Sequence, residues 1–374
     1  MLGALFVVQT AGAQSKVAAD PQNFGIAAST ITVADVANPG PGTGYNNPRY
    51  QAPNGSPLDG VARLLMFQQN GSPYSGCTGT LLGDGHSILT AAHCVSPLAG
   101  NPVLGSVQAG FLNSSGVLTN LKASSWTVMS GYTGSVVDPN DLAILHLDNI
   151  APDWIPRYSL YTGNPLGQQV DFVGFGLTGN GITGGTVNTL FSDLAGGTPV
   201  RRFGLNSWDA TYDGRFVYDY NAVPIMLSDF DSGSPSTNFL CQVFGGPASG
   251  ANPQTCNSGY GINEVAIGSG DSGGPGMIFN TMTGQWEVAG VASFGAVRCY
   301  NPTTGQAVSY TGTCPAGFQV NGSYFGSYSG HVSVSGGAQA LFVADTAPEP
   351  SSLALLGTGL AGIIPMARRR RRTA

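Results

Sequence analysis

The chain has 374 residues, with few charges and many turn-forming residues. Charged residues make up only 9% of it, whereas it contains 56 glycines and 24 prolines. This composition favours an exported, all-β protein with short strands over a helical cytosolic one. The net charge is -6, and without the five cations at Arg368 to Arg372 the rest of the chain carries -11. Because this part of the chain is so acidic, we do not expect nucleic acid or an anionic membrane surface as its partner.

The N-terminal region has the pattern of a targeting segment followed by a flexible one. Residues 2–8 are apolar, and Ala11-Gly12-Ala13 has the small-x-small pattern of a signal-peptide cleavage site. We therefore expect a signal peptide at residues 1–13. Residues 14–57 are rich in Ala, Pro, Asn and Gly and show little apolar periodicity, which predicts a propeptide or a flexible arm.

The central region, residues 58–345, consists of short apolar runs that turn-forming residues separate. The runs are rich in Val, Ile, Leu, Phe and Tyr, and Gly, Asn, Asp and Pro interrupt them. This spacing predicts short strands in a sandwich or a barrel, without an internal repeat. The clearest predicted strands are residues 62–67, 78–82, 87–91, 142–147, 170–175, 277–279 and 286–294.

The six cysteines follow one another in three pairs whose members are 15 to 17 residues apart. An even number of cysteines in an exported chain predicts disulfides, and we expect neighbours to pair. No pair has the Cys-x-x-Cys spacing that is typical of zinc or thioredoxin sites, so we expect no metal. The predicted pairs are Cys77 with Cys94, Cys241 with Cys256, and Cys299 with Cys314.

A glycine-rich segment at residues 268–276, Gly-Ser-Gly-Asp-Ser-Gly-Gly-Pro-Gly, encloses Ser272. Glycine permits positive φ values and close approach of the backbone, so the segment is suited to expose N–H groups around one hydroxyl. On composition alone, a flexible Gly/Ser linker is the alternative interpretation. A nucleophilic serine would need a histidine base, an acid that orients the base, and N–H donors for the oxyanion.

Only four histidines can supply such a base. His86 lies in a predicted turn, and His146 alternates within a predicted strand. For His331 we expect a packed or surface position rather than a pocket. His93 differs, because it ends a strand-to-helix turn in Ile-Leu-Thr-Ala-Ala-His-Cys at residues 88–94.

Four motifs in order resemble those of the chymotrypsin-like, or trypsin-fold, serine proteases. The resemblance extends over roughly residues 58–343, and it implies an all-β fold of two antiparallel six-stranded β-barrels with the active site between them. Outside the barrels we expect a disordered N-terminal arm and a C-terminal hydrophobic helix. The motifs are Cys-Thr-Gly-Thr-Leu-Leu at 77–82, Ile-Leu-Thr-Ala-Ala-His-Cys at 88–94, Asp-Leu-Ala-Ile-Leu-His-Leu at 141–147, and Gly-Asp-Ser-Gly-Gly-Pro at 270–275.

This resemblance implies a role for each member of a catalytic triad. His93 would be the general base beside the Cys77–Cys94 bridge, Asp141 would orient it, and Ser272 would be the nucleophile. The N–H groups of Gly270 and Ser272 would form the oxyanion hole. Two other carboxylates lie near Asp141, but Asp138 precedes a proline in a predicted turn and Asp148 begins a loop.

The segment Gly270-Asp271-Ser272-Gly273-Gly274 also fits the Gly-x-Ser-x-Gly elbow of the α/β-hydrolases. That fold needs a helix directly after the serine, with an acid and then a histidine downstream. Here Gly273 to Gly276 with Pro275 oppose a helix, and downstream His331 precedes Asp345. The sequence therefore favours the first family.

The resemblance also indicates which residues would contact substrate. Ala266 would lie at the floor of the specificity pocket, and its lack of charge argues against Lys or Arg in the substrate. Ser293-Phe294-Gly295 resembles the strand that pairs with the substrate backbone. We expect cleavage after apolar or aromatic residues, although Glu264 lies close to the predicted floor.

One family feature has only a weak counterpart. Many relatives begin with Ile-Val-Gly-Gly, whose freed amine pairs with the acid before the nucleophile, and the nearest segment here is Leu58-Asp59-Gly60-Val61-Ala62. Two possibilities for Asp271 stay open: an amine that is freed near Pro57, or an internal partner.

The C-terminal residues 346–374 combine three features in order. Pro348-Glu349-Pro350 precedes an apolar stretch at residues 353–367 and then five arginines. This resembles the bacterial PEP-CTERM sorting signal, which implies an exosortase-type enzyme in a Gram-negative cell, with at least transient membrane anchoring. We then expect a periplasmic, cell-surface or extracellular location.

The sequence thus predicts a secreted, monomeric serine endopeptidase that needs no cofactor. The alternative from another class is a catalytically silent, protease-like surface module that binds a partner. A structural matrix protein would explain the sorting tail but not the triad motifs.

Overall fold

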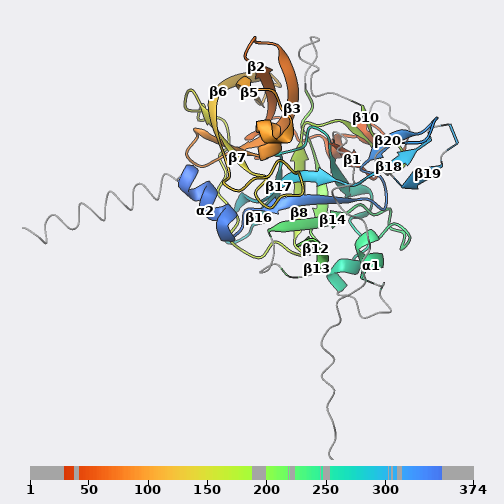
Figure 1. The fold of residues 1–374 in the computed structure, drawn as a ribbon. Helices are drawn as coiled ribbons and strands as arrows, with labels where there is room; N and C mark the ends of the chain where they lie inside the picture. Colours follow the sequence, from red (N-terminus) through yellow and green to blue (C-terminus); the bar gives the residue numbers. More distant parts are fainter. Residues whose placement is uncertain are drawn as a thin grey trace, which may run out of the picture.

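The computed structural model (Figure 1) describes residues 29–37, 42–187, 199–217, 219, 224–244, 246, 253–301, 303–304, 306–309 and 314–347. The predicted signal peptide and the apolar stretch at residues 353–367, with its expected C-terminal helix, lie outside these residues. Among the described residues, no helix has the length and apolar character that crossing a membrane requires.

The first half of the protein is a closed six-stranded antiparallel barrel. Its strands pair in the order β2-β3-β4-β7-β6-β5. Apolar side chains of β2 and β7 fill the interior, whereas most residues of β6 are exposed or half-buried. The strands are β2 (Val61–Gln68), β3 (Pro73–Leu81), β4 (Ser87–Thr90), β5 (Leu104–Leu112), β6 (Leu118–Val128) and β7 (Ala143–Leu147).

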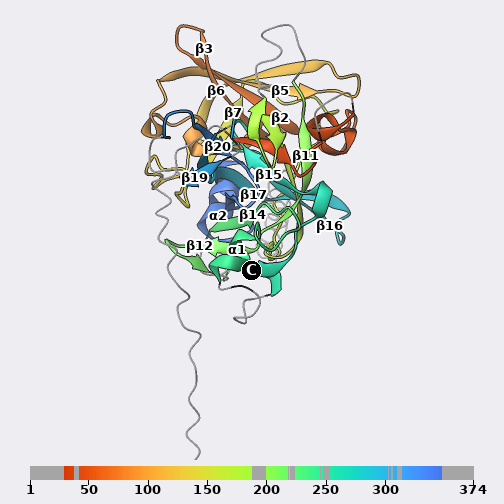
Figure 2. The ribbon, with the colours of Figure 1, turned by 90° about the vertical axis from the view of Figure 1, so that its right-hand side faces the viewer.

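The second half is a large curled sheet with a smaller sheet beside it (Figures 1 and 2). The eight strands of the large sheet pair in the order β11-β8-β16-β17-β21-β14-β12-β13, and the four of the small sheet in the order β10-β9-β1-β15. The predicted all-β, chymotrypsin-like fold is confirmed. In the described residues, however, the second half is a curled open sheet with more than six strands rather than a closed six-stranded barrel, and the small sheet includes a parallel pair, β1 with β9. The large sheet contains β8 (Gln169–Gly174), β11 (Arg202–Ser207), β12 (Ala210–Tyr212), β13 (Phe216–Val217), β14 (Ile225–Asp229), β16 (Pro275–Asn280), β17 (Gln285–Gly295) and β21 (Tyr328–Ser333), and the small sheet contains β1 (Ser29–Val33), β9 (Thr178–Asn180), β10 (Gly184–Val187) and β15 (Val265–Gly268).

All seven of the clearest predicted strands are present, within one to five residues of their predicted ends. All three predicted disulfides are also present. Cys241–Cys256 joins α1 (Phe239–Val243) to η8 (Pro253–Cys256), and Cys299 lies in a small sheet of β18 (Val297–Tyr300), β19 (Ala307–Ser309) and β20 (Gln319–Gly322). The remaining short helices are η2 (Gly44–Asn46), η3 (Pro48–Tyr50), η4 (Ala92–Cys94), η5 (Pro97–Ala99) and η9 (Gly261–Asn263).

Part of the predicted flexible arm is folded. Strand β1 lies inside the small sheet, and its residues Ile31 and Val33 are buried in the core of the second half. Tyr50 is buried in the same core. The flexible-arm prediction is therefore wrong for these residues, because strand pairing and core packing with distant segments hold them in place, and the local composition does not reveal these partners.

The two halves meet at the glycine-rich segment. The N–H of Thr78, in β3, donates to the Ser272 carbonyl at 2.9 Å, and the Thr78 hydroxyl donates to the Gly270 carbonyl at 2.7 Å. The last described element, α2 (Gly337–Thr346), packs against the first barrel through Val343, and Gln339 donates to the Pro139 carbonyl. These contacts fix the segment around Ser272 against the strand that carries Cys77.

Candidate active site

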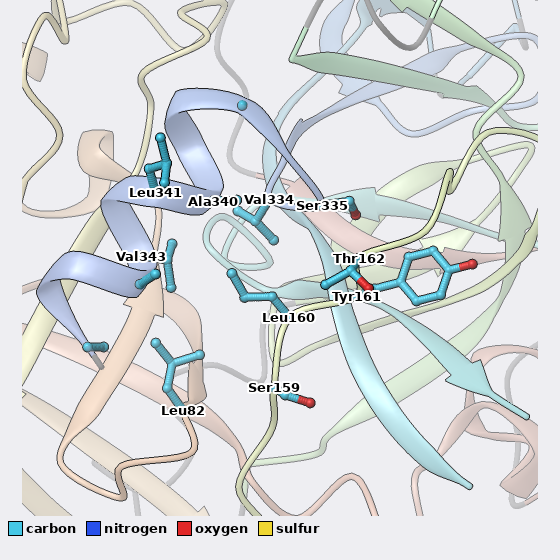
Figure 3. Close-up of a pocket in the computed structure, with 13 residues that line it drawn as sticks. Leu82, Ser159, Leu160, Tyr161, Thr162, Val334, Ser335, Ala340, Leu341 and Val343 are labelled. Atoms are coloured by element: carbon cyan, nitrogen blue, oxygen red, sulfur yellow. The ribbon is translucent and has the colours of Figure 1, made fainter. Parts of the chain in front are cut away.

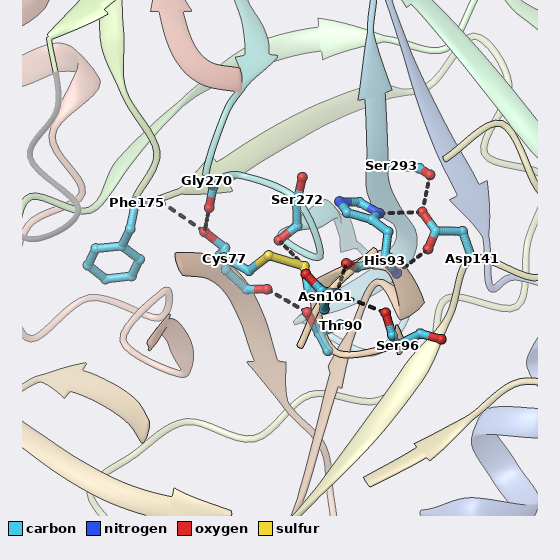
Figure 4. The surroundings of a disulfide bond; sticks show 12 residues. Cys77, Thr90, His93, Ser96, Asn101, Asp141, Phe175, Gly270, Ser272 and Ser293 are labelled. Atoms are coloured by element: carbon cyan, nitrogen blue, oxygen red, sulfur yellow. Dashed lines mark hydrogen bonds and ion pairs between the residues drawn. A yellow bond between two sulfur atoms is a disulfide. The ribbon is translucent and has the colours of Figure 1, made fainter. Parts of the chain in front are cut away.

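His93 is held by a short helix and a disulfide. It is the middle residue of η4, which follows β4, and the Cys77–Cys94 bridge ties this turn to β3. The imidazole Nδ1 lies 2.7 Å from Asp141 Oδ2, and the His93 N–H donates to Asp141 Oδ1 at 2.8 Å. The same carboxylate therefore orients both the backbone and the ring of His93 (Figure 4).

Asp141 is completely buried, and of the three nearby aspartates it is the one that contacts His93. The Asp138 carboxylate instead accepts from the N–H of Thr133 at 2.7 Å, and that of Asp148 accepts from the Ser124 hydroxyl at 2.9 Å. Asp138 and Asp148 thus stabilise turns or strand ends. A third donor to Asp141 is the hydroxyl of Ser293.

Ser272 lies on the side of the imidazole away from Asp141. Figure 4 shows its side chain beside the His93 ring, and in the described part of the chain no hydrogen bond joins the two. Glycines permit this arrangement: Gly270 and Gly273 have φ values of 91° and 80°, which other residues rarely adopt. A Cβ at Gly273 would also lie 2.0 Å from the Thr90 hydroxyl oxygen.

The backbone N–H groups around Ser272 differ in whether they donate a hydrogen bond within the protein. Those of Asp271, Gly273 and Gly274 donate to protein carbonyls. Within the described residues, those of Gly270 and Ser272 donate to no protein acceptor. Buried N–H groups without a partner are uncommon, and two beside one hydroxyl form a site that can accept an oxyanion.

Asp271 has internal partners. Its carboxylate accepts from the N–H of Gly176 at 2.9 Å and from the N–H of Gly268 at 3.0 Å. Burial raises the pKa of Asp271 to about 7, while these two N–H groups and the charge of Arg202 lower it. Arg202 is itself buried, on β11, where it pairs with Gly174.

The predicted specificity residues lie along two strands of the second half. Ala266 is buried in β15, and Ser293, Phe294 and Gly295 end β17. Ser293 also contacts Asp141, a contact that sequence reasoning missed. Glu264 is buried, and its carboxylate accepts from the N–H groups of Asp231 and Tyr260.

The other histidines lie elsewhere. His331 stacks on Phe172 with ring centroids 4.3 Å apart, and burial lowers its pKa to about 3. His146 contacts the Thr127 hydroxyl. One group of possible metal ligands brings His93 close to Cys77 and Cys94, but the two sulfurs are bonded to each other and cannot act as thiolates.

A separate cavity of about 600 Å³ lies between α2 and residues 159–162 (Figure 3). Its lining is mainly apolar and includes Leu82, Leu160, Val334, Ala340 and Val343. It contains none of the triad residues, so it does not belong to this site.

Sequence analysis also missed two residues outside the predicted triad that contact or influence the segment around Ser272. Thr78 donates hydrogen bonds to the Gly270 and Ser272 carbonyls, and Arg202 places a buried positive charge near Asp271. Thr78 lies within one of the four motifs, whereas the neighbourhood of Arg202 carries no sequence signal.

Two comparisons with known families bear on this arrangement. Residues 59–196 match the trypsin family, and residues 346–372 match the PEP-CTERM protein-sorting motif. The first match includes His93 and Asp141 and ends before Ser272. No curated protein matches the chain.

Proposed function

The chain is a trypsin-fold protein with a PEP-CTERM sorting motif, and from this premise we propose that it is a serine endopeptidase. One observation carries the proposal. The buried Asp141 carboxylate binds the His93 ring at 2.7 Å, and Ser272 lies beside the ring on the opposite side, next to two unpaired N–H groups.

The arrangement supports acyl transfer through a covalent intermediate. The Ser272 oxygen attacks the substrate carbonyl, and His93 takes the serine proton and then gives it to the leaving amine. Asp141 holds the Nδ1–H tautomer and stabilises the imidazolium. The N–H groups of Gly270 and Ser272 bind the oxyanion, and water then hydrolyses the acyl-enzyme by the same steps.

The proposed substrates are polypeptides with an apolar or aromatic residue before the cut. Ala266 offers no charge to a substrate side chain. The Glu264 carboxylate is bound by two backbone N–H groups, so it is not directed to a basic substrate residue.

The sorting motif supports an exported location. We propose that an exosortase-type enzyme of a Gram-negative cell recognises residues 346–372 and that the tail anchors the protein at least transiently. The signal peptide would end at Ala13, and a monomer would act in the periplasm, at the cell surface or outside the cell.

Labelling with a fluorophosphonate probe tests the activity, because such probes react with an activated serine. We expect the wild-type chain to be labelled and Ser272→Ala to remain unlabelled. Ser87→Ala, which changes a buried serine outside the site, is the matched control and should label like the wild type. Cut sites in a peptide mixture, mapped by mass spectrometry, should then follow apolar or aromatic residues.

Failure of the wild-type chain to label would contradict the proposed activity and favour the silent binding module. Equal labelling of Ser272→Ala would assign the reactive serine elsewhere. Cuts mainly after Lys or Arg would overturn only the proposed specificity.

A further inference from the structure

Strand β1 lies between the two segments that hold the Asp271 carboxylate. On one side it pairs antiparallel with β15, with Ser29 opposite Gly268 and Thr32 opposite Ala266. On the other side it pairs parallel with β9, with Thr32 opposite Gly179. Because β9 and β15 do not pair with each other, β1 is the connection between them within this sheet.

These two segments supply the donors to Asp271. Gly268 is the last residue of β15, and Gly176 lies two residues before β9. Their N–H groups bind opposite oxygens of the carboxylate, at 3.0 and 2.9 Å. The two segments also meet directly, because the N–H of Leu177 donates to the Ser269 carbonyl at 2.8 Å. Together with this bond, β1 holds the spacing of β9 and β15 at which both donors reach Asp271, the residue between the two unpaired N–H groups of the site.

Further contacts fasten β1 in place. The Thr178 hydroxyl donates to the Ile31 carbonyl at 3.0 Å, and the N–H of Gly181 donates to the Val33 carbonyl at 3.1 Å. Ile31 and Val33 are buried with Val265 and Ile267 of β15. The strand is thus an integral part of the core beside the catalytic loop.

The positive charge near Asp271 comes from a buried side chain of the second half. Arg202 is buried, and its charge lowers the pKa of Asp271 against the larger effect of burial. Near Pro57 the uncut chain is held in place by Tyr158, which donates to the Pro57 carbonyl at 2.6 Å and accepts from the N–H of Gly60 at 3.1 Å.

We propose that residues 29–33, in the uncut chain, are the positioning strand of the catalytic loop at residues 268–272. This inference rests on the proposed function and adds its regulation. The protein is active with its N-terminal segment intact, and loss of β1 inactivates it. Cleavage near Leu58 is not required.

The first test compares the full chain with a variant that lacks residues 1–37, both retaining the C-terminal tail. We expect fluorophosphonate labelling to fall at least ~30-fold in the shortened chain, because the donors to Asp271 are no longer held together. A synthetic peptide of residues 27–37 should restore labelling in a saturable manner, whereas a scrambled peptide should not. Rescue by added peptide is a result that general destabilisation would not give.

A point variant covers the case in which the shortened chain does not fold. Thr178→Val removes the hydroxyl that holds the Ile31 carbonyl, and we expect a several-fold lower kcat with little change in KM. Thr211→Val removes a similar buried hydroxyl on β12, away from β1, and should leave kcat unchanged.

The outcomes separate this inference from the proposed function. If the full chain is not labelled, the proposed function itself fails. If the shortened chain is labelled as fast as the full chain, or if the labelled species begins at or beyond residue 34, only the role of β1 is overturned. A further combination of results would also overturn it. In this case Thr178→Val has the same kcat as the wild type, and the shortened chain folds but is not labelled after the peptide is added.

Discussion

At the residue scale, the Asp141 carboxylate is the most constrained group of the site. It is completely buried, and it is surrounded by the N–H and ring of His93 and the hydroxyl of Ser293. A buried carboxyl group without hydrogen-bond partners would be costly, and these groups supply its partners. They also prevent the carboxylate from rotating away from the imidazole.

Replacing Ser293 by alanine removes one of these donors. A hydrogen bond to a charged group contributes about 1.5–3 kcal/mol, so we expect kcat to fall roughly 10-fold or more. Steady-state hydrolysis of a peptide substrate measures this fall.

Ser87→Ala is the matched control, because the Ser87 hydroxyl donates to the Asp84 carboxylate at 2.7 Å outside the site. Its kcat should stay that of the wild type. An unchanged kcat in Ser293→Ala would show that the Ser293 hydroxyl does not support Asp141.

Sequence reasoning reached the residues that local motifs contain. The structure brings His93 and Asp141 together as the motifs predict, because short, rigid turns of defined composition carry them. Sequence reasoning could not assign Ser293 to Asp141 or Arg202 to the surroundings of Asp271, because those contacts join residues far apart in the chain. Such pairings depend on the register of whole strands.

At the element scale, the same limit explains why β1 was missed. Ser-Thr-Ile-Thr-Val is rich in β-branched residues, but it lies in a region whose overall composition is typical of flexible segments. Its partners, β9 and β15, are far away in the sequence. By contrast, the first barrel was largely predictable, because most of its strands join their sequence neighbours.

Helix α2 gives a test of packing at this scale. Its small residues Ala340 and Ala344 line the apolar cavity of about 600 Å³, so the helix does not fill the space beneath it. Ala340→Leu would place an apolar side chain there, and we expect about 1 kcal/mol of stabilisation and a Tm roughly 2 °C higher.

The matched control is Ala338→Leu on the exposed face of the same helix, which should leave the Tm unchanged. Equal Tm values for the two variants, or a lower Tm for Ala340→Leu, would mean that the cavity does not admit the side chain.

At the scale of the whole molecule, the second half buries an unusual number of carboxyl groups. Besides Glu287, six of those in the described residues are at most 5% exposed. Burial is the largest cause of the raised pKa of each, to about 6 for Asp229, 7 for Asp171 and 8 for Asp231. The six are Asp171, Asp209, Asp229, Asp231, Glu264 and Asp271.

These groups determine how stability should depend on pH. Each aspartate keeps its proton to a higher pH in the folded chain than at its ordinary pKa of 3.8, so the folded state binds more protons between the two values. The free energy of unfolding therefore falls as the pH rises through this range. His331 acts oppositely between pH 6.5 and about 3, because its folded pKa is lowered, but one histidine opposes several carboxyl groups.

We expect maximal stability at about pH 4–5 and a Tm at pH 8 that is lower by ~5 °C or more. Thermal unfolding of Ser272→Ala, which prevents self-digestion, measures this. In that background Asp231→Asn should flatten the decline between pH 5 and 8, because the amide cannot lose a proton. Asp153→Asn, at an exposed position, should leave the slope unchanged. A Tm that rises from pH 5 to pH 8 would mean that the buried carboxyl groups are stabilised in their ionised form.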